Sequence, residues 1–351
     1  MFYPLRIKNI RRETEDCVSL AFEIPAQVQE KFAFKQGQYL TFRANVGGEE
    51  LRRSYSICSS PNDGELRVAI KQVYEGKFST YANQTLKKGD ILETMPPMGR
   101  FYSEMNAENA KNYVFFAAGS GITPILSILK TVLKSEPNSS ITLVYGNKNT
   151  ASVIFKESIE DLKNKYLSRV QVYHVLSRER TDTALFSGRL DSQKIDALLN
   201  DIPSLSQGDE YFLCGPEDMV KALQTAFNAR NIDKNKVHFE LFGTNKVKNI
   251  VAKPVTALKK HLLYLQQDGL VSEIRLDSHE YVLDAALAAG FDVPYACKGG
   301  VCCTCRAKIT SGEVEMDVNY ALDHHEVDNG FILTCQARAI SEEIFVNFDL
   351  V

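Results

Sequence analysis

The chain has 351 residues, of which 44% are apolar and 24% charged, and its formal net charge is −3 at pH 7. This length is enough for two or three domains, and the near-neutral charge argues against nucleic-acid binding. No stretch is apolar over the roughly 18 residues that a membrane span needs, and the N-terminus lacks the apolar segment of a signal peptide. These features predict a cytoplasmic protein with reduced thiols, in which clustered cysteines indicate metal or redox chemistry.

The charge is unevenly distributed along the chain. Residues 259–351 contain 7 basic and 15 acidic residues, a balance of −8, whereas the other 258 residues have a balance of +5. This asymmetry predicts a separate acidic C-terminal module that can dock on a basic surface. Simple solubility is the alternative explanation.

Residues 1–106 contain short apolar segments separated by turn signals. "LRRSYSICSSP" and "ELRVAIKQV" predict two strands, and the Pro-Asn-Asp-Gly sequence at 61–64 predicts a hairpin turn between them. Many short strands in about 100 residues are typical of a small antiparallel barrel or sandwich.

Residues 107–243 have a different period. Predicted strands at "NYVFFAAG", "ITLVYGN", "VQVYHVLS" and "DEYFLCGP" alternate with predicted helices at "TPILSILKTVLK", "SVIFKESIEDLKNKY" and "EDMVKALQTAFNAR". This alternation indicates βαβ units and a parallel sheet.

The C-terminal third begins with a polar, basic segment at 244–258, which we predict to be a linker. Residues 259–351 contain predicted strands at "SEIRL", "AKITSGEVEM" and "EIFVNFD" and one helix at "YVLDAALAAG". Gly290 follows this helix in a position typical of a C-terminal cap.

Four cysteines in this last segment have the spacing of metal ligands. Three follow the pattern C-x4-C-x2-C and the fourth lies 30 residues later, a spacing used by plant-type [2Fe–2S] ferredoxins. Structural zinc is the alternative, but zinc sites usually have two close ligand pairs. The predicted ligands are Cys297, Cys302, Cys305 and Cys335.

The residues around these cysteines have predicted roles of their own. Gly299 and Gly300 are expected to let the loop wrap closely around a cluster. Cys303 is interpreted as a packed neighbour that is not a ligand. His324 and His325 are conceivable zinc ligands, but "LDHHE" is more simply a solvated loop. Cys17 and Cys58 are expected to be ordinary buried thiols.

"RRSYSI" has the pattern R-x-Y-S, which suits a flavin. Arg53 can contact a pyrophosphate, Tyr55 can stack on a flat ring, and Ser56 can direct a hydroxyl at a ring nitrogen. Strand alternation puts Tyr55 and its two polar neighbours on opposite faces. About 20 residues later, "GKFSTY" predicts a helix whose first amides bind phosphates. A plain surface strand and a simple turn are the alternatives. The candidate flavin contacts are Arg53, Tyr55, Ser56, Ile70, Gly76, Lys77, Phe78, Ser79 and Thr80.

"FFAAGSGITPILSIL" reads as a strand, a glycine turn and a helix with Pro124 in its first turn. This setting supports pyrophosphate binding, although the segment departs from G-x-G-x-x-G. Ser177 and Arg178 follow a strand where a ribose 2′-phosphate would lie, which favours NADPH over NADH unless Arg178 is simply a surface cation. The candidate nucleotide contacts are Gly119, Gly121, Thr123, Pro124, Ser177, Arg178, Cys214, Gly215 and Phe242.

Taken together, these motifs resemble the ferredoxin–NADP reductase superfamily, in the members with a plant-type ferredoxin domain at the C-terminus. "EELRRSYSIC", "AAGSGITP", "YGNKN", "PYACKGGVCCTC" and "VNYAL" are especially similar to reductase subunits of the phenylacetyl-CoA epoxidase family of bacterial phenylacetate degradation. The resemblance implies an antiparallel β-barrel with FAD (1–106), an α/β parallel-sheet domain with NADPH or NADH (107–243), the linker (244–258) and a β-grasp [2Fe–2S] ferredoxin domain (259–351). Cys303 departs from the family, which commonly has a small residue there.

The resemblance also implies an oxidoreductase that passes electrons from NADPH through FAD and the cluster to a partner, a di-iron oxygenase that acts on phenylacetyl-CoA. The flavin accepts a two-electron hydride and releases electrons singly. Tyr55, Ser56, Cys214 and Glu240 are the candidate catalytic residues, acting mainly by positioning. The alternatives are a reductase for another oxygenase or for a deoxysugar dehydratase, a stand-alone reductase of ferredoxin or quinone, and a non-catalytic redox or zinc scaffold.

Overall fold

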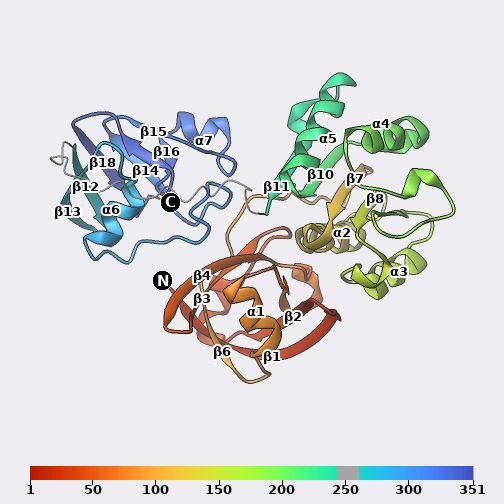
Figure 1. The fold of residues 1–351 in the computed structure, drawn as a ribbon, viewed down its shortest axis with the longest axis horizontal. Coiled ribbons are helices and arrows are strands. Elements are labelled where there is room, and N and C mark those ends of the chain that lie inside the picture. Colours follow the sequence, from red (N-terminus) through yellow and green to blue (C-terminus); the bar gives the residue numbers. More distant parts are fainter. Residues whose placement is uncertain (243–260, 351) are drawn as a thin grey trace. The chain divides into compact units, whose positions relative to one another are not determined.

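The structure is a computed structural model that describes residues 1–242 and 261–350 (Figure 1). It contains two compact units, one from Phe2 to Phe242 and one that includes residues 261–350. The predicted linker at 244–258 lies outside the described residues. Within the described residues, no helix is long and apolar enough to cross a membrane.

The first part of the larger unit is a six-stranded antiparallel sheet in the order β4-β3-β6-β1-β2-β5 (red and orange in Figure 1). A bridge between Ile57 and Val68 joins the two outer strands, and Cys58 N donates to Arg67 O at 2.8 Å beside it, so the sheet closes into a barrel. The predicted antiparallel barrel is confirmed. Its elements are β1 (Tyr3–Thr14), β2 (Cys17–Glu23), β3 (Tyr39–Val46), β4 (Glu49–Ser56), β5 (Leu66–Lys71), β6 (Ile91–Thr94) and helix α1 (Lys77–Gln84).

The second part is a five-stranded parallel sheet in the order β11-β10-β7-β8-β9, as predicted. Helices cover both faces of this sheet, as two neighbouring residues of β7 show. Phe115 lies in the core with α2 and α3 on one face, whereas Phe116 contacts Phe227 of α5 on the other. The elements are β7 (Asn112–Ala118), α2 (Ile122–Ser135), β8 (Ser140–Asn147), α3 (Lys156–Lys165), β9 (Val170–Leu176), α4 (Ser192–Asp201), β10 (Glu210–Gly215), α5 (Glu217–Ala229) and β11 (Val237–Leu241).

The predicted hairpin between β4 and β5 is wrong. β4 pairs with β3 and β5 pairs with β2, so the two strands meet mainly at the bridge that closes the barrel. The connection is not a tight turn, because Pro61–Asp63 forms a turn of 3-10 helix capped by Ser60. Asp63 then binds α2 through Lys130 at 3.1 Å and Lys134 at 2.7 Å. The loop therefore fastens the barrel to the parallel-sheet domain.

Two helices of the parallel-sheet domain also differ from the prediction. The segment predicted as helical from Ser152 begins its helix at Lys156, because Asn149 caps a short 3-10 turn and Phe155 adopts a left-handed φ of 59° just before α3. Helix α4 is not among the predicted elements. Its start is marked by Asp191, whose side chain accepts a hydrogen bond from Lys194 N at 3.0 Å.

The smaller unit contains a mixed five-stranded sheet in the order β13-β12-β18-β14-β16, with α6 packed on it. The parallel pairing of β12 with β18, flanked by antiparallel neighbours, is the β-grasp arrangement that we predicted. Its elements are β12 (His261–Gln267), β13 (Leu270–Leu276), α6 (Val282–Ala288), β14 (Arg306–Ser311), β15 (Val314–Met316), α7 (His324–Asp328), β16 (Phe331–Leu333), β17 (Ala337–Ala339) and β18 (Glu343–Asn347).

Two predictions for this unit need correction. The strand expected over "AKITSGEVEM" breaks at Gly312, whose φ is 80° and whose missing Cβ would lie 2.3 Å from Glu343 O. The loop expected at "LDHHE" is helix α7. Asp323 accepts from Glu326 N at 2.8 Å, and Glu326 accepts from Asp323 N at 3.2 Å. This reciprocal capping box is present in the sequence as Asp-x-x-Glu.

Candidate functional site

Strand β4 presents its R-x-Y-S residues on alternating faces. The ring of Tyr55 lies 5.7 Å from Phe78 and 6.2 Å from Phe42, and burial raises the pKa of its hydroxyl, which stays protonated. Ser56 points the other way, and its Oγ donates to Glu240 Oε2 at 3.1 Å. Arg53 is exposed. This strand therefore offers a guanidinium, an aromatic ring and a hydroxyl within four residues, the groups that a flavin site requires.

The loop before α1 is closed by Gly76, the N-cap of the predicted helix. A Cβ at this position would lie 2.4 Å from Val73 Cγ2 and 2.5 Å from Ser79 Oγ, so any larger residue would displace these two side chains. The Ser79 hydroxyl donates to Gly76 O at 3.0 Å and accepts from Val73 N at 3.2 Å. Exposed Lys77 begins the helix and forms an ion pair with Glu49. Free amides and a lysine at a helix start suit a phosphate.

Three other predicted flavin contacts, Ile70, Phe78 and Thr80, contact other parts of the barrel domain. Ile70 is fully buried and Phe78 is 2% exposed, and both lie in the barrel core. Their side chains support β5 and the Tyr55 ring and do not line an open surface. Thr80 accepts a hydrogen bond from Gln72 Nε2 at 3.2 Å, which ties α1 to the end of β5.

The glycine turn after β7 brings main chain close to β10. Gly119 adopts a left-handed φ of 53°, and the missing Cβ of Gly121 would lie 2.1 Å from Cys214 O. Thr123 Oγ1 donates to Ser120 O at 3.0 Å, and Pro124 is buried in the first turn of α2. The turn therefore lies at the carboxyl edge of the sheet, where open α/β sheets bind ligands.

Cys214 and Glu240 are register partners on β10 and β11 at this edge. Cys214 is fully buried, and burial raises the pKa of its thiol, so it is not a reactive thiolate. Glu240 is partly exposed along its length, but its carboxyl group is crowded, and this desolvation raises its pKa to about 7. With Ser56 bound to Glu240, groups from both domains of the larger unit meet here. Gly215 is buried beside them, and Phe242 is 39% exposed at the end of β11.

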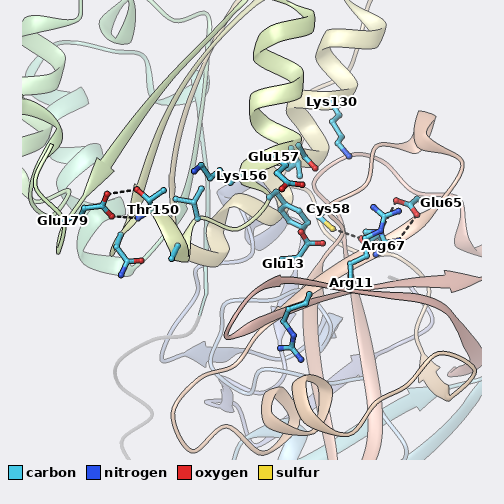
Figure 2. Close-up of a pocket in the computed structure, with 17 residues that line it drawn as sticks. Arg11, Glu13, Cys58, Glu65, Arg67, Lys130, Thr150, Lys156, Glu157 and Glu179 are labelled. Atoms are coloured by element: carbon cyan, nitrogen blue, oxygen red, sulfur yellow. Dashed lines mark hydrogen bonds and ion pairs between the residues drawn. The ribbon is translucent and has the colours of Figure 1, made fainter. Parts of the chain in front are cut away.

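Ser177 and Arg178 lie exposed directly after β9. Their amides donate to Asn147 O at 2.9 Å and Lys148 O at 2.7 Å, which fixes the loop against the end of β8. The next residue, Glu179, accepts from Thr150 N at 2.7 Å and from Thr150 Oγ1 at 2.8 Å (Figure 2). Glu179, the acidic residue that follows Arg178, is therefore bound to the neighbouring loop.

A cavity of about 780 Å³ lies between the barrel and the α2–α3 face of the parallel sheet (Figure 2). Its lining mixes cations such as Arg11 and Lys156 with carboxylates such as Glu13 and Glu157, and includes none of the predicted cofactor contacts. Cys58 forms part of the wall but is only 1% exposed, and burial raises the pKa of its thiol. Cys58 and the fully buried Cys17 are thus the ordinary buried thiols that we predicted.

The four predicted cluster ligands converge in the smaller unit. Cys297 Sγ and Cys302 Sγ lie 3.2 Å apart, and thiol–thiol hydrogen bonds join Cys335 to both Cys297 and Cys305. These bonds, together with the Gly299 amide at 3.3 Å, lower the pKa of Cys297. Four sulfurs gathered around one loop, with an amide directed at them, fit a [2Fe–2S] cluster.

The loop backbone follows the prediction in part. Gly300 has a φ of 73°, and its missing Cβ would lie 2.7 Å from Val318 O, so glycine is required. Gly299 is not among the residues with positive φ; Lys298, at 51°, takes the second left-handed position. Cys303 Sγ donates to Ala321 O at 3.2 Å and packs against the core, while His324 and His325 are exposed on α7.

Comparison with known proteins agrees with this domain set. The oxidoreductase FAD-binding domain matches residues 4–102, the oxidoreductase NAD-binding domain matches 115–225, and the 2Fe-2S iron-sulfur cluster binding domain matches 265–339. The fold and the site thus define an NAD(P)H-dependent flavin and iron–sulfur oxidoreductase. The chain belongs to the ferredoxin–NADP reductase superfamily, in the branch with a C-terminal [2Fe–2S] domain, and its cofactors are FAD, a nicotinamide nucleotide and that cluster.

Individual relatives match over nearly the whole chain. The E component of 1,2-phenylacetyl-CoA epoxidase from Escherichia coli K12 is 41% identical, over 99% of this chain and 98% of that protein. The ferredoxin reductase component of 3-ketosteroid-9-alpha-monooxygenase from Rhodococcus rhodochrous is 31% identical, over 98% and 96%. The solved structure of phthalate dioxygenase reductase has a TM-score of 0.58 at 22% identity and covers 99% and 98%, which shows a shared fold. The chain has the architecture of an oxygenase reductase component.

Gly121→Ala is expected to abolish tight nucleotide binding. The added methyl would lie 2.1 Å from Cys214 O, so the turn must move away from β10 and the predicted pyrophosphate amides move with it. Displacements of about 1 Å can cost on the order of 100-fold in rate. The measurement is the Kd of NADP⁺ by calorimetry, with Asn164→Ala as control because Asn164 is an exposed residue of helix α3. Unchanged NADP⁺ affinity in Gly121→Ala would contradict the predicted site.

Proposed function

We propose that this chain is the reductase component of a phenylacetyl-CoA epoxidase, and that its partner is the di-iron oxygenase component that epoxidises the ring of phenylacetyl-CoA. The observation that carries the proposal is the 41% identity with the E component of that epoxidase over 99% of the chain. The 3-ketosteroid and glycine betaine reductase components are 31% and 27% identical over comparable lengths. A reductase for a different oxygenase is the second candidate that these relatives favour.

We propose that β4 and the start of α1 hold FAD. Arg53 and Lys77 supply positive charge for the pyrophosphate, and the amides that follow Gly76 supply donors. Tyr55 presents a ring that neighbouring aromatics hold in place. When bound, FAD accepts a hydride and passes on single electrons. The chain contributes orientation and exclusion of water, since Ser56 and Cys214 are nearly or fully buried.

The nucleotide is proposed to lie along the carboxyl edge of the parallel sheet. The Gly119–Gly121 turn would hold its pyrophosphate, Cys214 would border the nicotinamide, and Ser177 with Arg178 would hold a 2′-phosphate. Hydrogen bonds from Thr150 lower the pKa of Glu179, which therefore stays ionised and opposes a phosphate, but they also hold its carboxylate against the neighbouring loop. We propose NADPH as the preferred electron donor because Arg178 supplies positive charge where the 2′-phosphate would lie.

Arg178→Ala is expected to remove the preference for NADPH. A guanidinium–phosphate bond contributes about 1.5–3 kcal/mol, so kcat/KM for NADPH should fall roughly 10- to 100-fold while that for NADH stays constant. Steady-state kinetics with a dye acceptor measure both values, and Lys165→Ala, an exposed cation on α3, serves as the charge control. Equal losses with the two nucleotides would argue against a 2′-phosphate contact.

The cell location and the domain limits are also proposals. A reducing cytoplasm suits four cluster thiols and buried free Cys17 and Cys58. Boundaries at 106/107, 243/244 and 258/259 are supported by the split of the structure at residue 242 and by family matches to 4–102, 115–225 and 265–339.

Reconstitution tests the proposed partner. The purified chain is mixed with the oxygenase component of a phenylacetyl-CoA epoxidase, NADPH, oxygen and phenylacetyl-CoA, and in parallel with a 3-ketosteroid monooxygenase component and its steroid. We expect epoxide formation coupled to NADPH oxidation in the first mixture. Coupling only in the second mixture would favour the second candidate. Full activity with a quinone or a soluble ferredoxin, without coupling to either oxygenase, would favour a stand-alone reductase.

A further inference from the structure

The segment that carries the fourth cluster ligand also holds both ends of the loop that carries the other three. Thr334, directly before Cys335, is fully buried, and its Oγ1 donates to Cys305 O at 2.9 Å while its amide donates to the same oxygen at 3.1 Å. Gln336, directly after Cys335, is 7% exposed, and its Nε2 donates to Lys298 O at 3.1 Å. The two neighbours of Cys335 therefore bind opposite ends of the cluster loop.

Lys298 adopts an unfavourable backbone conformation in this loop. Its φ of 51° lies in the left-handed region, which costs a residue with a Cβ roughly 1–2 kcal/mol. Its Nζ lies 2.9 Å from Asp284, but both side chains are about half exposed, and such pairs contribute little. The partly buried hydrogen bond from Gln336 Nε2 to Lys298 O is therefore the stronger restraint on this conformation. Since Lys298 follows Cys297, the restraint acts directly beside a ligand.

The orientation of the Gln336 amide follows from its neighbours. The Nε2 atom also donates to Cys335 O at 2.9 Å and lies 3.8 Å from Cys335 Sγ. An amide oxygen in the same place would face two carbonyl oxygens, so the NH₂ group must point toward them. With two hydrogens for three acceptors, the carbonyls take the stronger bonds and the sulfur receives the weaker one. The N–H dipole of the amide thus lies beside a ligand sulfur.

We propose that Gln336 is a positioning residue for the iron–sulfur cluster. It joins the Cys297 end of the loop to the Cys335 segment, fixes the left-handed turn at Lys298 and contributes an N–H dipole beside the Cys335 sulfur. The inference builds on the cluster assignment and does not depend on which oxygenase is the partner. Hydrogen bonds to cluster sulfurs and outer-shell partners of the ligands set both the reduction potential and the retention of metal.

The test uses the full chain with its cofactors and the variant Gln336→Met, which has similar length and no charge but cannot donate. The readouts are the potential and g-values of the cluster from an EPR-monitored titration, and the half-life of its visible absorbance under a chelator. We expect a more negative potential, with the reduction equilibrium constant lowered about twofold to tenfold, and cluster loss accelerated about tenfold. Gln267→Met is the matched control, because its Nε2 donates to a single carbonyl, Asp292 O at 3.2 Å, from β12.

If Gln336→Met keeps the wild-type potential, g-values and half-life, the proposal is overturned, even if thermal stability falls, because that pattern means simple packing. If Gln336→Met assembles no cluster, Gln336→Asn is measured, which keeps the amide but shortens the side chain by one carbon. The proposal then requires that Gln336→Asn assembles a cluster with shifted potential or g-values. A cluster in Gln336→Asn that is identical to the wild type would contradict it.

Discussion

Cys302→Ser is expected to lose the [2Fe–2S] cluster and all electron delivery to an oxygenase, whereas Cys303→Ser retains both. Cys302 is 7% exposed and its sulfur lies 3.2 Å from that of Cys297, within the group of four thiols. The adjacent Cys303 directs its sulfur at Ala321 O at 3.2 Å, and a serine hydroxyl can make the same bond. Two substitutions of the same kind at neighbouring positions thus have opposite predicted effects.

The measurement for this pair combines iron content, the EPR signal of the reduced protein and two activities. Cys302→Ser should oxidise NADPH with a small dye acceptor at the wild-type rate, because the flavin and nucleotide residues lie in the other unit. Its oxygenase-coupled activity should fall to background. Loss of the cluster in Cys303→Ser, with its retention in Cys302→Ser, would show that the ligand assignment is wrong by one position.

Glu240→Gln is expected to lower the rate of flavin reduction and to remove its dependence on pH near neutrality. Burial raises the pKa of Glu240 from 4.5 to about 7, so the carboxyl group is mostly protonated at pH 6 and mostly ionised at pH 8. Hydride loss leaves positive charge on the nicotinamide, and a carboxylate next to Cys214 stabilises that charge. The rate in the wild type should therefore rise between pH 6 and pH 8.

Anaerobic stopped-flow mixing with NADPH gives this rate directly from flavin absorbance. Glu240→Gln should be slow and flat over the same pH range. Ser56→Ala should be slower than the wild type by roughly 10- to 100-fold, because Ser56 links β4 to Glu240 and fixes their geometry. Ser54→Ala is the control, since Ser54 bonds to Thr41 within the barrel at 2.9 Å. A wild-type rate that falls with rising pH, or a Glu240→Gln profile identical to the wild type, would refute the role of Glu240.

Local motifs were predictable from the sequence because their residues lie close together along the chain. The strand–turn–helix setting of the Gly119 turn and the C-x4-C-x2-C loop are such cases, and both form as expected. Helix α7 could also have been predicted, since Asp323 and Glu326 have the spacing of a capping box. The two adjacent histidines favour a loop when they are considered alone, so the helix is predictable only from its cap.

Contacts between distant segments were not predictable in this way. Ser56 and Glu240 are separated by 184 positions, and their hydrogen bond depends on how the barrel packs on the parallel sheet. The β4–β5 hairpin was wrong for the same reason, because closure of the barrel and the docking of Asp63 on α2 override a local turn signal. Gln336 belongs to no recognisable sequence motif. Its hydrogen bond to Lys298 O forms because the Cys335 segment packs against the loop that contains the other three cysteines.

Electrons are expected to pass from NADPH to the flavin and from there to the cluster. Rapid anaerobic mixing with NADPH, followed both by flavin absorbance and by freeze-quench EPR, tests this order directly. We expect flavin bleaching first and the signal of the reduced [2Fe–2S] cluster second, with only the first phase in Cys302→Ser. A cluster signal that appears at the same rate in flavin-free protein, or a flavin that is fully reduced while the cluster stays oxidised, would contradict the account.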